Sequence, residues 1–457
     1  MRRIITAISM FFVLYAGAFA SPDGPETDFS KGKEAFKSGK IGEAAVFFNE
    51  AVKLDPKNAA ALAYLGRTKS FTDPEGAIAD CEKAIKMDPG MAAAYIGRGN
   101  AKGKLGDING AIADMDTALG LEPKNAAAFD IRGFLKNKDL DYAGALRDYN
   151  AAIDIDPKTP VYFINRAAVK VNLKDFSGAL ADGDTAVRLA PDDAKAYNSR
   201  GAAFIGAGDT LNAVKDLERA TGLDGALAGP YCNKGVIWFK AGDYSGALEY
   251  YNKAIVLDPG NAGFYIKHGQ CEMKLLNYDG ALKDFNRAII IGTKNDPAVY
   301  IGRGLAFLML KNQINAMEDL EKAVKLGPEN AEAYSARAYA RMQKWRYSEA
   351  IEDFNKAVGL DQGDYNNYYL RAIAEAGTLE YEGAFKDCAR ALELKPPGPV
   401  QALIYHNRSV MKRRYGDVVG AMEDRELAAH AGYDAFHIVK DDRDGFEKLI
   451  DKHLNSY

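Results

Sequence analysis

The histidines and short glycine motifs of this 457-residue chain are the first candidates for chemistry. Gly97-Arg98-Gly99 resembles a nucleotide loop, but it does not follow a predicted strand. Asp107-Ile108-Asn109-Gly110 begins like a calcium loop and lacks the remaining acids. His430, His437 and His453 do not have the spacing of a metal site. Because GxSxG, GxxxxGK[ST], HExxH and CxxC motifs are absent too, the sequence predicts no enzyme, catalytic residue, cofactor or metal ligand.

A second chemical pattern is a pair of opposite charges that recurs along the chain. The basic member appears as Arg98, Arg132, Arg166, Arg200, Arg303, Arg337, Arg371 and Arg408, with Lys234 and His268 as substitutes. The acidic member appears as Asp80, Asp114, Asp148, Asp182, Asp216, Asp284, Asp319, Asp353, Asp387 and Asp424. Two charges that repeat in one frame predict a ladder of ion pairs, each worth about 0–1 kcal/mol when exposed. The functional alternative is an arginine stripe that binds anions.

Pairs of short helices carry these charges, and residues 231–259 show the arrangement most clearly. An amphipathic helix is predicted over 231–240, followed by a break at Gly242, with Asp243 as the cap of the next helix. The second helix places Ala247, Tyr251 and Ala254 on one face, at the spacing of a buried stripe. A proline at position 259 ends the unit, because proline lacks the N–H that would continue the helix.

The same unit recurs along most of the chain. Its closing proline is found at Pro56, Pro89, Pro123, Pro157, Pro191, Pro259, Pro328 and Pro396, at intervals of 33 or 34 residues or about twice that. Its small second-helix residue is found at Ala51, Ala84, Ala118, Ala152, Ala186, Ala220, Ala254, Ala288, Ala323, Ala357, Ala391 and Ala428. This pattern resembles the tetratricopeptide repeat (TPR) over about residues 25–432. The resemblance implies an all-α solenoid, a right-handed superhelix of about twelve helix-turn-helix repeats.

The ends of the chain fall outside this frame and suggest three segments. Arg2 and Arg3 precede an apolar run, and small residues follow, so residues 1–20 are predicted to be a signal peptide cleaved between Ala20 and Ser21. The alternative is an uncleaved membrane anchor, although the run is short for a bilayer crossing. Residues 21–432 form the predicted solenoid, and residues 433–457 a C-terminal capping helix. The expected location is therefore outside the cytoplasm, periplasmic or secreted, with no stable membrane span after cleavage.

Composition limits the classes of partner. The formal net charge of −4 becomes −6 without Arg2 and Arg3, which does not favour nucleic acid or an anionic membrane. The four cysteines occupy repeat positions too far apart, or facing too differently, for easy bridging, so four reduced and mostly buried thiols are expected. The alternative is a bridge between Cys232 and Cys271. The aromatic residue that opens each repeat, such as Tyr231, is expected to lie in the core.

The TPR resemblance also implies where a partner would bind. In that family the first helices form a concave groove that holds other proteins, and its lining positions carry specificity. The groove candidates in this sequence are Asn137, Asn165, Asn172, Lys195, Asn198, Asn233, Val236, Phe239, Lys267 and Gln270. Amides can bond a peptide backbone as donor and acceptor, while apolar residues accept side chains. The alternative is that these are ordinary solvated helix positions.

One TPR subclass grips acidic chaperone tails through a carboxylate clamp, and the resemblance to it is partial. Asn165 and Lys195 fall on two clamp positions. Asp130, Phe134 and Ser199 stand where the clamp has Lys, Asn and Arg, so a clamp is not expected.

The sequence thus predicts an exported, non-enzymatic TPR scaffold that binds protein or peptide partners. The alternative is an accessory of an envelope or polysaccharide assembly or export complex that contacts glycan or a synthase. Self-association through the end repeats is compatible with both.

Overall fold

The computed structural model describes residues 24–70 and 72–432. The predicted signal peptide, its cleavage site and the predicted capping helix over 433–457 lie outside the described residues. Within them every regular element is an α-helix, and the helices alternate between the two types that the repeat predicts.

The first helices of the repeats are α2 (Pro25–Lys37), α4 (Ala59–Lys69), α6 (Ala92–Leu105), α8 (Ala126–Lys138), α10 (Pro160–Asn172), α12 (Ala194–Ala207), α14 (Ala228–Lys240), α16 (Ala262–Lys274), α18 (Pro297–Met309), α20 (Ala331–Met342), α22 (Tyr365–Gly377) and α24 (Gly398–Tyr415). The second helices are α3 (Ile41–Leu54), α5 (Pro74–Met87), α7 (Ile108–Leu121), α9 (Tyr142–Ile155), α11 (Phe176–Leu189), α13 (Thr210–Leu223), α15 (Tyr244–Leu257), α17 (Tyr278–Ile291), α19 (Gln313–Leu326), α21 (Tyr347–Leu360), α23 (Tyr381–Glu393) and α25 (Val418–His430).

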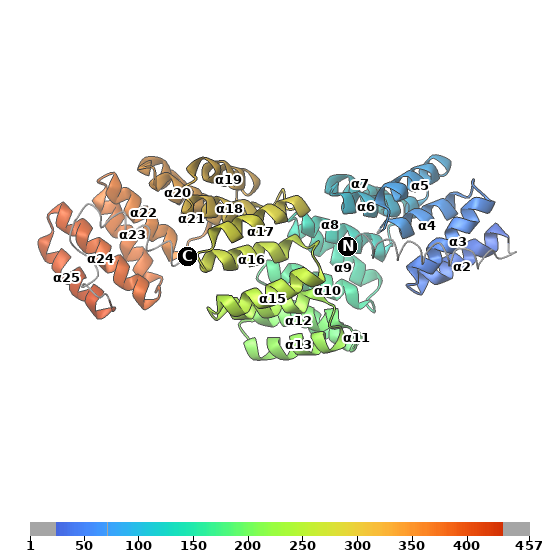
Figure 1. Cartoon of the computed structure of the whole chain (residues 1–457), viewed down its shortest axis with the longest axis horizontal. Helices are drawn as coiled ribbons and strands as arrows, with labels where there is room; N and C mark the ends of the chain where they lie inside the picture. Colours follow the sequence, from blue (N-terminus) through green and yellow to red (C-terminus); the bar gives the residue numbers. More distant parts are fainter. Residues whose placement is uncertain (1–23, 71, 433–457) are drawn as a thin grey trace. The chain divides into compact units, whose positions relative to one another are not determined.

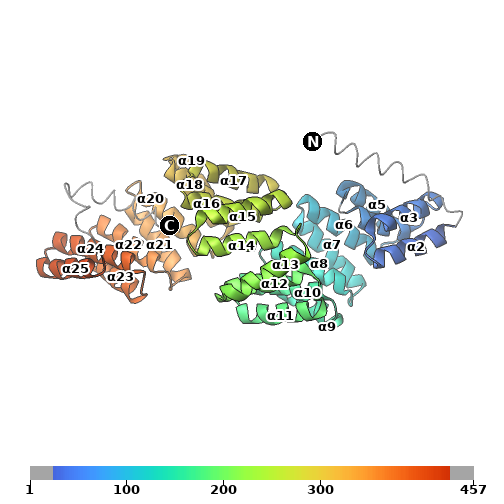
Figure 2. The same cartoon turned by 60° about the horizontal axis from the view of Figure 1, so that its bottom comes forward.

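Contacts divide the described chain into two compact units, residues 24–233 and 234–432, with the boundary inside α14. Within each unit a first helix packs on its own second helix, and that second helix contacts the first helix of the next repeat. The stacked pairs are visible in both cartoon views (Figure 1, Figure 2). The sequence-based assignment of residues 21–432 to one domain stays a prediction.

Capping side chains start the second helices, as the sequence predicts. Asp243 accepts a hydrogen bond from the backbone N–H of Gly246 at 2.8 Å, which satisfies one of the donors that a helix start leaves open. The same bond recurs at Asp107, Asp141 and Asp175, and Asn277 replaces the aspartate in α17. This repeated cap fixes where most second helices begin, whereas α3, α21 and α23 start without a side-chain cap.

The turn between the helices of a repeat requires one residue in the left-handed region. Gly242 occupies it with φ of 81° in the repeat at 231–259, and Gly208 with φ of 82° in the repeat before. In other repeats a side chain stands there, as with Leu276 at φ 60° and Trp345 at φ 61°. A non-glycine residue pays a steric cost of about 1–2 kcal/mol in this conformation.

The core repeats one contact between an aromatic ring and a glycine. Ala247, Tyr251 and Ala254 are 0%, 2% and 0% exposed, so the predicted buried stripe is confirmed. A Cβ at Gly235 would lie 2.5 Å from the Tyr251 ring, so only glycine lets α14 approach the ring this closely. All twelve alanines of the repeated small position are likewise buried. Packing of this kind, rather than chemistry, accounts for the residues that make the repeat recognisable.

The opening aromatics divide into two groups. Tyr231, Tyr300 and Tyr368 are buried, while Tyr95 and Tyr197 are half-buried. The Tyr95 hydroxyl donates to the carbonyl of Pro89 at 3.2 Å, and comparable bonds anchor Tyr197 and Tyr231. These rings therefore belong to the structural frame.

The four cysteines all lie within the described residues, are buried and form no disulfide. The alternative bridge between Cys232 and Cys271 is therefore wrong. Burial raises the pKa of Cys81, Cys271 and Cys388 to about 12, which keeps these three side chains as neutral thiols at physiological pH.

Candidate functional site

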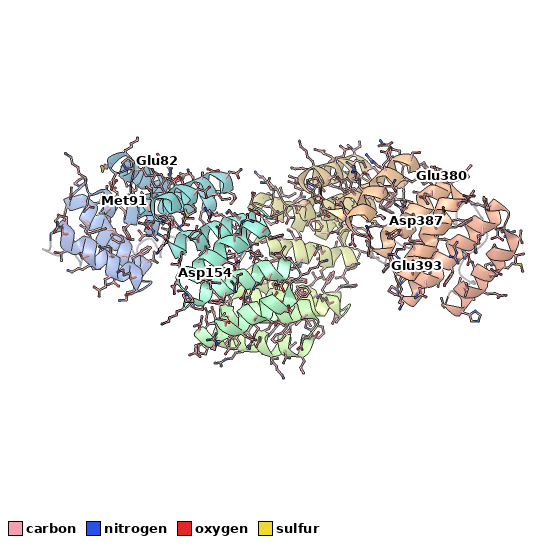
Figure 3. All side chains as sticks on the ribbon, turned by 180° about the vertical axis from the view of Figure 1, so that it is seen from behind. Glu82, Met91, Asp154, Glu380, Asp387 and Glu393 are labelled. Atoms are coloured by element: carbon pink, nitrogen blue, oxygen red, sulfur yellow. The ribbon has the colours of Figure 1, made fainter. Side chains whose placement is uncertain are left out.

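The repeating arginines bind the repeating aspartates, as the ladder hypothesis requires. Arg166 Nε and Nη2 donate to the two carboxylate oxygens of Asp182 at 2.9 and 2.6 Å. The same forked pairing joins Arg98–Asp114, Arg132–Asp148, Arg200–Asp216, Arg303–Asp319, Arg337–Asp353, Arg371–Asp387 and Arg408–Asp424. Asp387, labelled in Figure 3, comes from α23.

Several arginines also reach the preceding repeat, which turns separate pairs into a ladder. Arg132 Nη1 donates to Asp116 at 2.7 Å, and Arg166 Nη1 donates to Asn150 at 2.7 Å. Both acceptors lie on the second helix of the repeat before. The arginine side chains therefore tie neighbouring repeats together.

The acidic members of these pairs are buried, so the range of 0–1 kcal/mol for exposed pairs does not apply to them. Asp148 is 2% and Asp424 1% exposed, because the first helix of the same repeat packs against each second helix and places its arginine on the carboxylate. A buried carboxylate depends on its partners, since removing one leaves an uncompensated charge. The alternative of an anion-binding arginine stripe finds no support here, because these guanidinium groups already donate to carboxylates.

Four repeats depart from the pairing. The first repeat has Phe47 at the aspartate position. In the second repeat Asp80 is paired with Lys69 at 2.6 Å, because Leu65 stands at the arginine position.

The other two departures lie in consecutive repeats. His268 replaces arginine, and its Nδ1 lies 2.7 Å from Asp284 Oδ2. In the repeat at 231–259, Lys234 takes the arginine position and Tyr250 takes the aspartate position. The Tyr250 ring stacks on Trp238 with centroids 6.4 Å apart.

A cation four residues after the arginine position on the first helix binds the aspartate in six repeats, which the sequence reasoning missed; one of the six is the lysine–aspartate pair of the second repeat. Lys170 Nζ, four residues after Arg166, lies 2.8 Å from Asp182 Oδ2, the oxygen that also accepts from Arg166 Nε. Lys102, Lys136, Arg341 and Lys412 do the same in their own repeats. Glu375 takes this position after Arg371, and its Oε2 is buried without a hydrogen-bond partner in the described part of the chain.

The candidate site is the surface made by the first helices, which carries the residues that the frame does not use. We call it the first-helix face and define it by the second, fifth, sixth, ninth, twelfth and thirteenth positions of each repeat. Each unit contributes its own part. In residues 24–233 the predicted members are Asn137, Asn165, Asn172, Lys195, Asn198 and Asn233; in residues 234–432 they are Val236, Phe239, Lys267 and Gln270.

Hydrogen bonds already join several of the predicted amides across adjacent first helices. Asn165 Nδ2 donates to Asp130 Oδ1 at 2.8 Å, and Asn233 Nδ2 donates to Asn198 Oδ1 at 2.9 Å. A Cβ at Gly229 would lie 3.0 Å from Asn198 Nδ2, so this glycine allows the close approach. These three asparagines thus have a structural role, and part of their bonding capacity is used within the protein.

The other predicted members differ in accessibility. Asn172 and Lys195 are exposed, whereas Asn137 is half-buried with an Oδ1 that has no hydrogen-bond partner among the described residues. In the second unit Gln270 is exposed, while Val236, Phe239 and Lys267 are half-buried. Phe239 packs edge-on against Tyr244 with centroids 5.3 Å apart.

The positions of the carboxylate clamp fit an internal role instead. Asp130 accepts from Asn165, and burial raises the pKa of its carboxyl group. Ser199 Oγ donates to the carbonyl of Ile164 at 3.3 Å. An acidic and a hydroxyl side chain therefore stand where a clamp needs cations.

The sequence candidates for metal chemistry remain scattered. His430 is exposed and bonded to the carbonyl of Glu426, while His437 and His453 lie outside the described residues. Among residues 24–70 and 72–432 there is no group of three His, Cys, Asp or Glu side chains that could hold a metal ion. In the same part of the chain no helix combines the length and apolar character of a membrane span.

Family models described as "Tetratricopeptide repeat" match residues 29–58, 92–125, 228–261 and 314–367. The chain is a TPR protein. The predicted all-α TPR solenoid is thus confirmed, and helix pairs in the same frame also occupy the stretches between the matches.

Curated relatives share short parts of this TPR protein. It is 36% identical over 89 residues to the "Heat shock protein sti1 homolog" of Schizosaccharomyces pombe, covering 18% of this chain and 14% of that protein. It is 34% identical over 82 residues to "Stress-induced-phosphoprotein 1" of Caenorhabditis elegans, covering 17% and 25%. It is 34% identical over 85 residues to the "Hsp70-Hsp90 organizing protein" of Triticum aestivum, covering 18% and 14%. The match therefore spans a seventh to a quarter of each relative.

Among solved structures, the APC/C hetero-tetramer Cut9-Hcn1 is similar with a TM-score of 0.53. The alignment covers 97% of this chain and 99% of that chain at 13% identity. At this identity the likeness shows the fold alone.

Proposed function

We propose that this chain is an exported, non-enzymatic TPR scaffold that holds an extended segment of a partner protein on its first-helix face. The main support is that the repeated residues and the variable residues of each repeat have different roles. Buried alanines, ring-on-glycine contacts and the ion-pair ladder absorb the repeated residues, which leaves the variable residues of the first helices for recognition. Preformed helices favour such binding because little conformational entropy is lost in shaping the site.

The chemistry of the first-helix face suits a polypeptide. Exposed Asn172 and Gln270 offer amides to a peptide backbone, and half-buried Val236 and Phe239 offer apolar contact. Trp238 on α14 is 42% exposed but its ring stacks on Tyr250, and Trp345 is 63% exposed in the turn before α21. A sugar-binding platform, which typically uses exposed tryptophan rings, has less support on the first-helix face.

The names of the relatives do not identify a partner for this chain. One of them is named for organising Hsp70 and Hsp90, yet the alignment covers only a small part of it. Asp130, Phe134 and Ser199 also replace clamp residues that would hold an acidic chaperone tail. Export, proposed from the N-terminal sequence, would separate the chain from cytosolic chaperones as well.

Affinity capture with a matched pair of variants tests the proposal. Gln270→Arg adds a bulky charge to an exposed first-helix position, and Ile290→Arg adds the same charge to an exposed position on second helix α17. The full chain and the Ile290→Arg variant are expected to retain the same protein from the envelope fraction of the source organism, while Gln270→Arg loses it. Retention of a glycan and no protein would contradict the proposal and favour the envelope-assembly alternative.

A further inference from the structure

Arg67 on α4 lies over aromatic rings, as the arginines of the ladder do, but it differs from them because no carboxylate among the described residues pairs with it. Its guanidinium carbon lies 4.9 Å from the Phe36 ring centroid and 5.4 Å from the Tyr64 ring centroid. These two rings meet edge-on at 90° with centroids 5.8 Å apart. Each cation–ring contact is worth about 0.5–2 kcal/mol, so the guanidinium is fixed in direction without a carboxylate.

No ion pair or hydrogen bond to the Arg67 guanidinium is formed within residues 24–70 and 72–432, and Glu122 acts on it only through its more distant charge. Burial lowers the pKa of Arg67 from 12.5, but a guanidinium at this site still stays charged at physiological pH. The donors of Arg67 are therefore available on the first-helix face, whereas those of Arg98 are bonded to Asp114.

The neighbouring repeats leave room for Arg67 and stabilise the rings. A Cβ at Gly97 would lie 3.0 Å from Arg67 Cγ, so the glycine on α6 makes space for the arginine stem. Phe29 lies 5.7 Å and Phe48 5.3 Å from the Tyr64 ring, which fixes the ring on which the guanidinium rests. The arrangement is therefore built by three successive repeats.

Two more cations on first helices repeat the same motif. Lys33 Nζ lies 4.8 Å from the Phe29 centroid, and Lys138 Nζ lies 5.2 Å from the Phe134 centroid. Neither ammonium forms an ion pair in the described part of the chain. Burial, together with the charge of Lys104, lowers the pKa of Lys138. A face that concentrates positive charge in this way is complementary to an anionic ligand.

We propose that the ring-held cations Lys33, Arg67 and Lys138 form a binding stripe for the Asp or Glu side chains of an extended, acidic protein segment. This inference rests on the proposed function and places its ligand in the first four repeats. First helices of successive repeats lie about 10 Å apart, which matches three residues of an extended chain at about 3.1 Å each. Lys33 and Arg67 come from successive repeats, so the ligand is expected to carry acidic residues about three positions apart for them. Lys138 lies two repeats after Arg67, so a third acidic residue is expected about six positions further along.

A peptide fits this stripe better than a nucleic acid. The faces of Phe36 and Tyr64 that meet Arg67 are already covered, so these rings do not offer free platforms for stacked bases. The cations come singly from α2, α4 and α8 and do not form the dense basic patch that marks a nucleic-acid surface.

Peptide selection on the full chain tests this inference. Random 12-residue peptides displayed on phage are selected, and C-terminally amidated synthetic copies are measured by fluorescence polarisation. Selected peptides are expected to be enriched in Asp and Glu, and replacing those residues by Asn and Gln is expected to weaken binding at least tenfold. Arg67→Met is expected to cause a similar loss, Arg67→Lys a smaller one, and Arg188→Met on the exposed side of α11 none.

The outcomes separate this inference from the proposed function. Peptides that bind without acidic enrichment, or that bind Arg67→Met as well as the unmodified chain, would overturn the acidic-stripe inference and leave the scaffold proposal standing. Tighter binding of a 20-residue oligothymidylate than of any selected peptide would overturn it as well. Absence of any peptide binding would count against both. If Arg67→Met does not fold by circular dichroism, Lys138→Met at its exposed site must lower the affinity about threefold.

Discussion

Glu375 offers the sharpest test of how the ladder works, because it places a carboxyl group where six other repeats place a cation. Burial, together with the charge of Asp387, raises the pKa of Glu375 to about 7, and Arg371 only partly offsets this. Glu380 adds a further negative charge. Both Asp387 and Glu380 are labelled in Figure 3. A Cβ at Gly383 would lie 2.9 Å from Glu375 Oε2, so α23 confines the carboxyl group.

The sign and size of the effect follow from the two pKa values. The folded value of about 7 lies above the ordinary 4.5, so the stability associated with Glu375 is fully present below about pH 4.5 and is lost as pH rises to about 7. The difference corresponds to about 3 kcal/mol. Since the side chain is only half-buried, solvent screening reduces the expected effect to about 1–2 kcal/mol.

Substitution of Glu375 should therefore stabilise the protein at high pH. Glu375→Gln is expected to raise the free energy of unfolding by about 1–2 kcal/mol at pH 8 and to change it little at pH 4.5. Glu375→Lys restores the cation that other repeats have at this position, and it should stabilise the protein at least as much as Glu375→Gln does. Lys170→Glu, which copies the Glu375 arrangement into another repeat, should destabilise at pH 8.

Urea unfolding followed by circular dichroism from pH 4.5 to 8.5 measures these differences. Hydrogen exchange of α22 and α23 locates them, because repeat proteins need not unfold in a single step. Equal effects of Glu375→Gln at pH 4.5 and pH 8, or a destabilising effect at pH 8, would refute this reasoning.

Three further predictions concern the turns, the ladder and the N-terminus. Leu276→Gly should raise the stability of the protein by about 1 kcal/mol, because glycine adopts the positive φ at this position without strain. Leu275→Gly, at φ −86°, should lower the stability. Thermal unfolding measures both variants, and equal shifts would count against backbone strain at Leu276. Arg337→Met should lower the free energy of unfolding by about 2–4 kcal/mol, because the buried Asp353 carboxylate loses a partner. The exposed Arg346→Met should show no measurable change in chemical unfolding. Comparable losses in the two variants would argue against a buried ladder. Mass spectrometry of the mature protein should find Ser21 at its N-terminus, and an intact leader would contradict the predicted cleavage.

Much of the frame could be predicted because it depends on contacts close in sequence. The cap at Asp243, the turn at Gly242 and the stripe through Tyr251 are read from residues a few positions apart. The pairing of Arg166 with Asp182 was also predictable, since a fixed spacing in every repeat brings the two charges together.

Features that depend on stacking between repeats were harder to predict. The burial of Asp182 follows from the packing of α11 against the neighbouring first helices α10 and α12, which the charge pattern does not reveal. The bond between Asn198 and Asn233 joins residues 35 apart, and the rings around Arg67 come from two helices. The cation after the arginine was visible as Lys102, Lys136 and Lys170, but its role depends on the carboxylate oxygen that it shares with arginine Nε.

The central claim is that the first-helix face, and not the outer surface, binds a partner protein. Val236 on α14 and Val256 on α15 give a matched pair of probe positions, the first on this face and the second 79% exposed on a second helix. A photo-crosslinking benzophenone amino acid placed at each position in the source organism measures contact directly. The account predicts a discrete protein adduct from position 236 and none from position 256. Adducts from position 256 alone, or equally from both positions, would contradict it.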